Sequence, residues 1–455
     1  MNNDTIVALA TPLGVSAIAV VRLSGPEAIQ ITNHIFSKDL TNSSSHSAHF
    51  GKIKSSDMFI DECIVTIFRS PSSYTKENIT EISCHGSPYI IEKIIQLCLE
   101  RGARLANKGE FTLRAFLNGQ LDLSQAEAVA DLIASDNEAA HKLAMQQLRG
   151  GYSNRLQELR KELIDLASLL ELELDFGEED VEFASRSQLK QTIQSSLVVV
   201  NQLAQSFETG NVIKNGIKAA IIGAPNAGKS TLLNALLNTE RAIVSDIPGT
   251  TRDTIEDQLI LEGHKFLLTD TAGIRESSDK IEEIGVERSR QEIKRSNLVI
   301  LVIDVSSTSY ADVAKQIELF GIDKERLILV LNKMDLWPTA EISEYASSTQ
   351  LDSKQVVPVS AKNKMNIGLL TEVMIQQSLG DPTDSTIVTN SRHYSALLDT
   401  QQALQKANQG LEIKLSADLI AMDIRHALYS IGIITGEVYT DDLLDNIFSN
   451  FCIGK

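Results

Sequence analysis

The chain has 455 residues, a hydrophobic content of 43% and a formal net charge of −18 at pH 7. This length suffices for about three domains, and the acidic balance argues against a protein that coats nucleic acid generally. Its four cysteines, which lack any C-x-x-C spacing, favour a reduced cytoplasm over a disulfide framework. The N-terminus has no basic region before its apolar residues, so we expect neither a signal peptide nor a transmembrane span.

The first 120 residues have the pattern of a mixed α/β domain. The runs Ile18–Val21 and Cys63–Phe68 indicate strands, and Ile90–Leu99 indicates a helix. Ser124–Glu127 then fits a capping box, from which helical periodicity continues to about residue 208. A seam for another helix is predicted by leucines spaced three and four apart: Leu156, Leu159, Leu163, Leu166 and Leu170.

Residues 223–230 read Gly-Ala-Pro-Asn-Ala-Gly-Lys-Ser and fit the pattern G-x-x-x-x-G-K-[ST]. The apolar run Ala219–Ile222 precedes this loop, and an amphipathic stretch follows it, which predicts a strand, a loop and a helix. The glycines allow backbone N–H groups to surround phosphate oxygens at a helix N-terminus. We expect Lys229 to reach the β- and γ-phosphates and the Ser230 hydroxyl to bind Mg²⁺.

Three further motifs follow in chain order, each after an apolar run. Asp270–Gly273 is expected to contact the magnesium ion and the γ-phosphate. Asn332–Asp335 is expected to recognise guanine, because a carboxylate accepts from its N1–H and its exocyclic amine, and adenine lacks this donor pair. Ser360–Lys362 is expected to close over the base. Together these motifs predict a GTP-binding domain of the Ras-like α/β class, with ligands at the C-terminal ends of parallel strands.

After the loop at Gly380–Pro382, helical patterning resumes to the C-terminus, with Leu397, Leu398 and Leu404 expected on one face. The predicted fold is therefore multidomain: a mixed α/β N-terminal domain, a discontinuous all-α helical domain and an inserted Ras-like α/β P-loop GTPase domain. Insertion is feasible because the two ends of such a domain lie close together. The expected segments are 1–120, 121–215, 216–378 and 379–455.

The residue that activates the attacking water is not evident from the motifs. The position where Ras-like enzymes often carry a glutamine is Ile274, which cannot hydrogen-bond to water. Either the domain is a slow switch, or a residue of the polar segment Arg275–Glu283 acts instead. Upstream, Ser245–Asp253 is the candidate first switch, and Thr251 is a second hydroxyl ligand candidate for Mg²⁺.

The cysteine near the chain end, Cys452, is the fourth residue counted from the end, but the terminal Gly454 and Lys455 do not fit a prenylation signal. Chemistry alone leaves two alternatives for it, an inert thiol or a redox or nucleophilic group.

Asn226, Gly249–Asp253, Asp270–Gly273 and the terminal Phe451–Lys455 together resemble the tRNA uridine modification GTPase family, MnmE or TrmE. The resemblance extends over the chain through Ala10–Pro12, Glu110–Phe111, Arg114–Asn118 and Leu121–Ala128. It implies a folate-binding N-terminal domain that forms a homodimer. It also implies a FAD-dependent flavoprotein partner, and a 5-carboxymethylaminomethyl or aminomethyl group formed on wobble uridine 34 of certain tRNAs.

The resemblance also implies roles for particular residues. Potassium would take the place of an arginine finger, and Glu282 would orient the water indirectly. Cys452 would serve the modification reaction. A tetrahydrofolate derivative (5-formyl or 5,10-methylene) would bind Arg22, Glu81, Gln120 and Lys455, although relatives usually carry Lys or Arg at position 120. The expected potassium ligands are Asn226, Ser245, Ile247 and Thr250. The expected GTP-binding residues are Asn226, Ala227, Gly228, Lys229, Ser230, Thr231, Ser245, Asp246, Ile247, Pro248, Gly249, Thr250, Thr251, Asp270, Thr271, Ala272, Gly273, Asn332, Lys333, Asp335, Ser360, Ala361 and Lys362.

Two other functions fit a GTPase of this kind. One is ribosome assembly, but such proteins usually carry a basic RNA-binding domain, which the net charge of −18 disfavours. The other is a regulatory switch that takes no part in tRNA chemistry.

Overall fold

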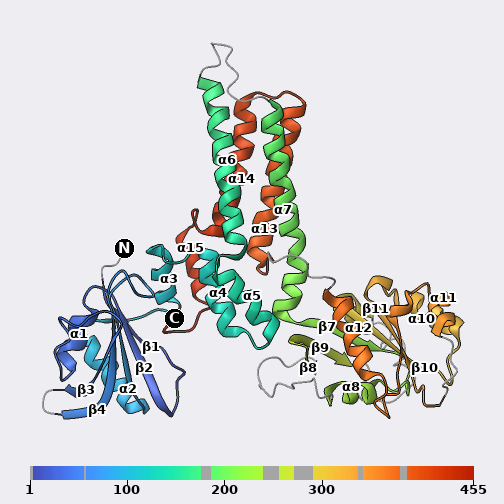
Figure 1. The fold of residues 1–455 in the computed structure, drawn as a ribbon, viewed down its shortest axis with the longest axis horizontal. Helices are drawn as coiled ribbons and strands as arrows, with labels where there is room; N and C mark the ends of the chain where they lie inside the picture. The colour runs from blue at the N-terminus through green and yellow to red at the C-terminus, as the bar shows by residue number, and fades with distance from the viewer. Residues whose placement is uncertain are drawn as a thin grey trace. The chain divides into compact units, whose positions relative to one another are not determined.

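The computed structural model describes residues 4–55, 58–175, 186–238, 256–270, 290–336, 342–379 and 387–455. The chain forms two compact units (Figure 1). Unit 1 comprises Met1–Ile133, Gln146–Leu197 and Ala396–Lys455, and unit 2 comprises Ala134–Met145 and Val198–Ser395. None of the helices that the structure describes combines the length and hydrophobicity needed to cross a bilayer.

Unit 1 begins with a six-stranded sheet in the order β3-β4-β5-β2-β1-β6, antiparallel except where β1 meets β6. Helices α1 (Ala28–Ile35) and α2 (Pro88–Leu99) pack on one face, so alternate strand residues are buried. The strands predicted at Ile18–Val21 and Cys63–Phe68 and the helix at Ile90–Leu99 are confirmed. The strands are β1 (Ile6–Leu9), β2 (Ser16–Ser24), β3 (Ser47–Ser55), β4 (Met58–Phe68), β5 (Ile79–Gly86) and β6 (Arg104–Leu105).

The rest of unit 1 is helical. Helix α6 packs along α14, and all five leucines of the predicted seam on α6 are buried. On the parts of α7 and α13 that belong to this unit, Lys190 pairs with Glu412 at 2.8 Å. The remaining helices with residues in this unit are α3 (Glu110–Leu117), α4 (Leu123–Ala134), α5 (Glu138–Leu148), α6 (Gly151–Asp175), α7 (Arg186–Asn215), α13 (Ser391–Glu412), α14 (Ala417–Thr435) and α15 (Asp441–Phe448).

Two local predictions in this helical region are wrong. The capping box lies two residues earlier than expected, because Asp122 accepts from the Gln125 N–H at 2.8 Å and the Gln125 side chain accepts from the Asp122 N–H at 2.9 Å. Ser124 is instead buried inside α4, where its hydroxyl oxygen lies 2.8 Å from Asp122 Oδ1 and 3.1 Å from Ser153 Oγ. Leu398 does not share the buried face of α13, since adjacent residues of a helix point about 100° apart.

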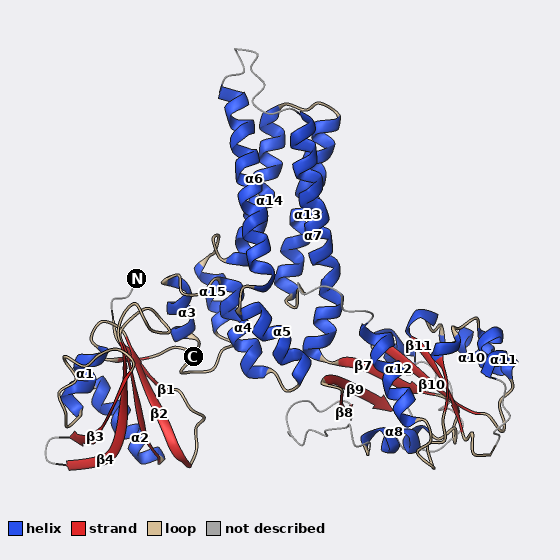
Figure 2. Cartoon of the chain, viewed as in Figure 1, coloured by secondary structure: helices blue, strands red, loops and turns tan. Residues whose placement is uncertain are grey.

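Unit 2 contains a six-stranded sheet in the order β12-β11-β10-β7-β9-β8, parallel except for β8 against β9. Helices flank both faces (Figure 2): α8 and α12 bury one side, and α10 and α11 bury the other. This confirms the predicted α/β P-loop class. The elements are β7 (Ile217–Ile222), α8 (Lys229–Leu237), β8 (Glu256–Leu261), β9 (His264–Asp270), β10 (Leu298–Asp304), α10 (Tyr310–Phe320), η2 (Lys324–Arg326), β11 (Leu327–Asn332), α11 (Ile342–Thr349), η3 (Ser353–Gln355), β12 (Val356–Pro358) and α12 (Ile367–Leu379).

Candidate active site

The glycine-rich loop joins the central strand β7 to α8, as the sequence pattern predicts. Gly223 and Gly228 have φ angles of +146° and +97°. A Cβ atom on Gly223 would lie 2.1 Å from the Val302 carbonyl oxygen, and one on Gly228 would lie 2.3 Å from Asn332 Nδ2. Both positions therefore require glycine for conformational and steric reasons.

Lys229 is buried at the first position of α8, and its ammonium lies inside the curve of the loop. Its Nζ donates to the carbonyl oxygens of Gly223 and Ala224, at 2.8 and 2.9 Å. The charge is thus held where a phosphate group at the N-terminus of α8 would meet it. Ser230 and Asn226 are exposed, and Asn226 has a φ angle of +62°.

Asn332 connects the phosphate loop with the segment expected over the base. Its buried side chain donates from Nδ2 to the Ala227 carbonyl at 2.8 Å and accepts from the Ala361 N–H at 3.0 Å. Ser360 donates to Asp335 Oδ1 at 2.6 Å, so the exposed carboxylate of Asp335 has a fixed orientation. The ends of β7, β11 and β12 therefore bring together three of the predicted motifs.

Other predicted residues lie outside the described part of the chain. They include Ser245–Thr251, Thr271–Gly273, Ile274 and Glu282; of Asp270, the backbone is described as the end of β9. The lysine of the last motif, Lys362, is exposed beside the buried Ala361.

A second group of predicted residues meets on the face of the N-terminal sheet opposite α1 and α2. Arg22 on β2 pairs with Glu81 on β5, with Nε and Nη2 at 2.8 and 2.7 Å from Glu81 Oε1. The Arg22 guanidinium also lies over the ring of Phe111, 5.7 Å from its centroid. Sequence reasoning missed Phe111 as a contact, because nothing in the local pattern links it to β2.

The chain terminus lies against this group. The Gly454 carbonyl accepts from Arg22 Nη1 at 3.2 Å, and Ile453 forms an isolated bridge with Lys108. Gly454 has a φ angle of +93°, and a Cβ atom there would lie 2.3 Å from the Leu9 carbonyl oxygen. Burial and the neighbouring Arg22 lower the pKa of Lys455, whereas Glu81 acts in the opposite direction.

Two other residues predicted for the folate and modification site, Cys452 and Gln120, are both exposed. Cys452 is an exposed free cysteine in the terminal segment, whereas Cys63, Cys84 and Cys98 are buried. Gln120 is exposed just after α3, and no described hydrogen bond joins its side chain to Arg22, Glu81 or Lys455.

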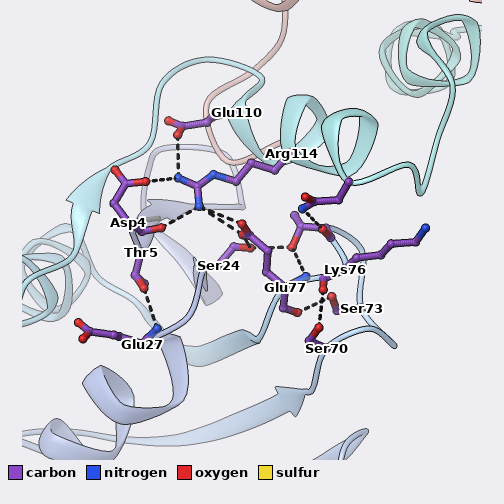
Figure 3. A network of polar contacts seen from close by, with 12 residues as sticks. Asp4, Thr5, Ser24, Glu27, Ser70, Ser73, Lys76, Glu77, Glu110 and Arg114 are labelled. Atoms are coloured by element: carbon purple, nitrogen blue, oxygen red, sulfur yellow. Dashed lines mark hydrogen bonds and ion pairs between the residues drawn. The ribbon is translucent and has the colours of Figure 1, made fainter. Parts of the chain in front are cut away.

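A partly buried charge network supports this end of unit 1 (Figure 3). Arg114 on α3 donates to Asp4 and Glu110, at 2.7 and 3.1 Å, and lies 3.3 Å from both oxygens of Glu77. Arg104 pairs with the same Asp4 and Glu110, at 2.7 and 2.6 Å. Burial opposes ionisation of Asp4 and Glu110, but the arginines outweigh it and lower the pKa of both carboxyls.

The fold and the phosphate loop define unit 2 as a P-loop nucleotide-binding domain, and comparison with known proteins specifies the family. The model described as "MnmE helical domain" matches residues 123–452, and "GTP-binding protein TrmE N-terminus" matches residues 5–120. A relative from Flavobacterium johnsoniae, named tRNA modification GTPase MnmE, is 52% identical over 100% of both chains. One of the same name from Cytophaga hutchinsonii is 50% identical over 100% of this chain and 98% of its own.

The chain belongs to the MnmE (TrmE) family, and it is a GTPase. Among solved structures, the G domain of the T. maritima FeoB iron transporter matches 35% of this chain and 98% of its own, at 25% identity. Its TM-score of 0.27 is too low to support a conclusion.

Proposed function

We propose that the protein couples GTP hydrolysis to modification of wobble uridine 34 in certain tRNAs, forming the 5-carboxymethylaminomethyl or aminomethyl group together with a flavoprotein partner. The names of the relatives, tRNA modification GTPase MnmE, support this proposal. The observation that carries it is the terminal segment with Cys452, which lies against Arg22 and Glu81 within unit 1. An exposed cysteine in a terminal segment that is bound by Arg22 is not expected in a GTPase that serves only as a switch.

We assign a role to each of the four segments expected from the sequence. Residues 1–120 form the folate-binding and dimerisation domain, 121–215 and 379–455 the helical domain, and 216–378 the GTPase domain. Free cysteines in the described chain suit a reducing compartment, the cytoplasm.

For the nucleotide, the residues present fit GTP with Mg²⁺. Lys229 and the N-terminus of α8 supply positive charge for the phosphates, and Asp335, oriented by Ser360, supplies the acceptor for guanine. Ser230, the first-turn hydroxyl of α8, is the proposed magnesium ligand together with Thr251. Magnesium bound there would neutralise charge on the phosphate oxygens.

For hydrolysis, we assign K⁺ to Asn226, Ser245, Ile247 and Thr250, and the orientation of water to Glu282. The exposed Asn226 side chain, placed on the rim of the loop by its φ angle of +62°, suits a ligand to an ion shared with a second G domain. A monovalent cation near the phosphates stabilises developing charge as an arginine would.

For the folate, the sheet offers complementary charges. Arg22 and Lys455 are cations suited to the glutamate carboxylates of a tetrahydrofolate. Both contacts from Arg22 use Oε1 of Glu81, which leaves Oε2 to accept from the donor edge of the pterin. Gln120 is retained as a weaker candidate, because it is exposed after α3 and carries no charge.

For the homodimer, the sheet face opposite α1 and α2 supplies apolar surface. Ile18, Phe50 and Ile64, on β2, β3 and β4, are 64%, 58% and 45% exposed. Apolar side chains on one sheet face are typical of a protein–protein interface.

Nucleoside mass spectrometry of tRNA tests the whole proposal. Cells that lack the protein should contain unmodified uridine 34, and the wild-type gene should restore the modification. Normal wobble uridines in the deletion strain would contradict the proposal and favour the regulatory switch. Co-sedimentation of the protein with ribosomal subunits, together with normal tRNA, would favour ribosome assembly.

A further inference from the structure

Asp304, the last residue of β10, has a carboxylate fixed by three hydrogen bonds. Its Oδ1 accepts from the backbone N–H and the hydroxyl of Ser306, at 3.0 and 2.6 Å. Its Oδ2 accepts from Lys333 Nζ at 2.5 Å. In the sheet, Asp304 is the register partner of Asn332, so both residues lie at the strand ends where the phosphate loop begins.

Lys333 is constrained at both ends of its side chain. Its backbone has a φ angle of +66°, a left-handed conformation that non-glycine residues rarely adopt. Such strain persists where the surroundings impose it, and it concentrates at functional sites. At the other end, the ammonium is held by Asp304, and the side chains of the pair are 32% and 16% exposed.

The lysine of this pair lies within Asn332–Asp335, the segment proposed for guanine recognition, and Asp304 lies beside it at the end of β10. Asn332 and Asp335 flank Lys333, and Asp335 is two residues away. A lysine ammonium without a fixed partner would be attracted to that carboxylate, where it would compete with the N1–H and amine of the base. The hydrogen bonds from Lys333 and Ser306 lower the pKa of Asp304 despite its burial, so the carboxylate keeps its charge at neutral pH.

We infer that Asp304 is a positioning residue of the guanine site. It holds the Lys333 ammonium away from Asp335 and fixes the methylene stem of Lys333 as an apolar surface for the purine. This inference rests on the proposed assignment of Asn332, Lys333 and Asp335 to guanine. The signal for it was present in the sequence, since Asp304 is a polar residue ending an apolar strand.

The variant Asp304→Asn tests the inference in the full-length protein. Both carboxylate oxygens of Asp304 accept hydrogen bonds. The amide that replaces the carboxylate has only one oxygen, so its NH₂ group must face another donor, either the Ser306 N–H or the Lys333 ammonium, and that hydrogen bond is lost. We expect the dissociation constant for GDP, measured with a fluorescent analogue, to rise roughly tenfold. The kcat at saturating GTP should stay within about twofold, because the pair acts on the base and not on the phosphates.

The matched control is Asp312→Asn, which changes an exposed carboxylate in the first turn of α10 that accepts a hydrogen bond from the hydroxyl of the N-cap residue Ser309. It should leave GDP affinity unchanged. A second readout is the preference for GDP over inosine diphosphate, which lacks the exocyclic amine. This preference should fall in Asp304→Asn if the released ammonium competes for Asp335.

The double variant with Lys333→Met separates positioning from folding. If Asp304 acts through the ammonium, adding Asp304→Asn to Lys333→Met should cost no further affinity. Additive losses, or wild-type GDP binding in Asp304→Asn, would overturn the inference. If Asp304→Asn does not fold, Ser306→Ala replaces it as the test. We expect Ser306→Ala to bind GDP two- to threefold more weakly, and unchanged GDP binding in this variant would contradict the inference. Unchanged GDP affinity in Asp335→Asn would instead refute the proposed guanine site itself.

Discussion

Arg22 on strand β2 donates a hydrogen bond to the Gly454 carbonyl at 3.2 Å, across 432 residues of sequence. The same guanidinium pairs with Glu81, so one side chain joins the proposed folate site to the terminal segment that carries Cys452. Ordering of that segment and binding at Glu81 should therefore be linked.

We predict that Cys452→Ser abolishes tRNA modification and leaves GTP hydrolysis near normal. Cysteine and serine have almost the same shape, so the terminal segment should keep its contacts with Arg22 and Lys108. Mass spectrometry of tRNA and GTPase rates in K⁺ are the two measurements. Modified uridine 34 in this variant would mean that the thiol is structural.

We predict that Glu81→Gln weakens tetrahydrofolate binding by roughly tenfold or more, because a charge-assisted hydrogen bond to the ligand is lost. Isothermal titration calorimetry on the full chain measures the change. Glu62→Gln is the control, since Glu62 on β4 pairs with Lys52 and both side chains are about half exposed. Equal affinity of Glu81→Gln and wild type would remove Glu81 from the site.

We predict that GTP hydrolysis needs K⁺ and falls in Na⁺ at matched ionic strength. The rate should rise with protein concentration if two G domains must meet to form the ion site. Asn226→Gly should lose the K⁺ stimulation, and its backbone should stay intact because glycine tolerates the φ angle of +62° at this position. Equal wild-type rates in the two salts would contradict the proposed role of potassium.

We predict that Glu282→Ala lowers kcat by roughly 10²-fold, the size expected for loss of a positioned catalytic group. Affinity for GTP should change little, because Glu282 is assigned to water and not to the nucleotide. Single-turnover rates and nucleotide titration separate these effects. A normal turnover would return the role to another residue, such as Arg275 or Glu276.

We predict that Arg114→Met destabilises the N-terminal sheet by about 1–3 kcal/mol, because Glu77 loses its arginine while Asp4 and Glu110 keep only Arg104. Hydrogen exchange of the β1 amides measures the local loss. The control is Lys52→Met, which breaks the exposed pair with Glu62 and should cost less than about 1 kcal/mol.

Acid should reduce the difference in hydrogen-exchange protection of β1 between the wild type and Arg114→Met. The pKa values of Asp4 and Glu110 lie below their ordinary values of 3.8 and 4.5. A lowered pKa stabilises the fold above the ordinary value, and the contribution disappears as pH falls through the folded value. Protection of β1 in the wild type should therefore fall below about pH 4 and approach that of Arg114→Met. A difference that is the same at neutral and acid pH would contradict the role of these carboxylates.

The sequence alone determined the class of the GTPase domain and the places of its motifs. Each motif followed an apolar run, and the structure has β7, β9, β11 and β12 at those runs. The phosphate loop was predictable because Gly223, Gly228 and Lys229 act through local backbone geometry, which short-range sequence encodes. The buried seam on α6 was predictable for the same reason, since helical periodicity is local.

The tertiary structure alone decided the contacts between residues that are distant in the sequence. The capping box moved to Asp122 and Gln125 because Ser124 is buried against Ser153 of α6, a contact that spacing within α4 does not reveal. The meeting of Arg22 with Gly454, and of Asp304 with Lys333, follows from strand order and from the path of the chain end. Such pairs arise because charged groups that folding removes from water must find partners wherever the fold brings them, whatever their separation in sequence.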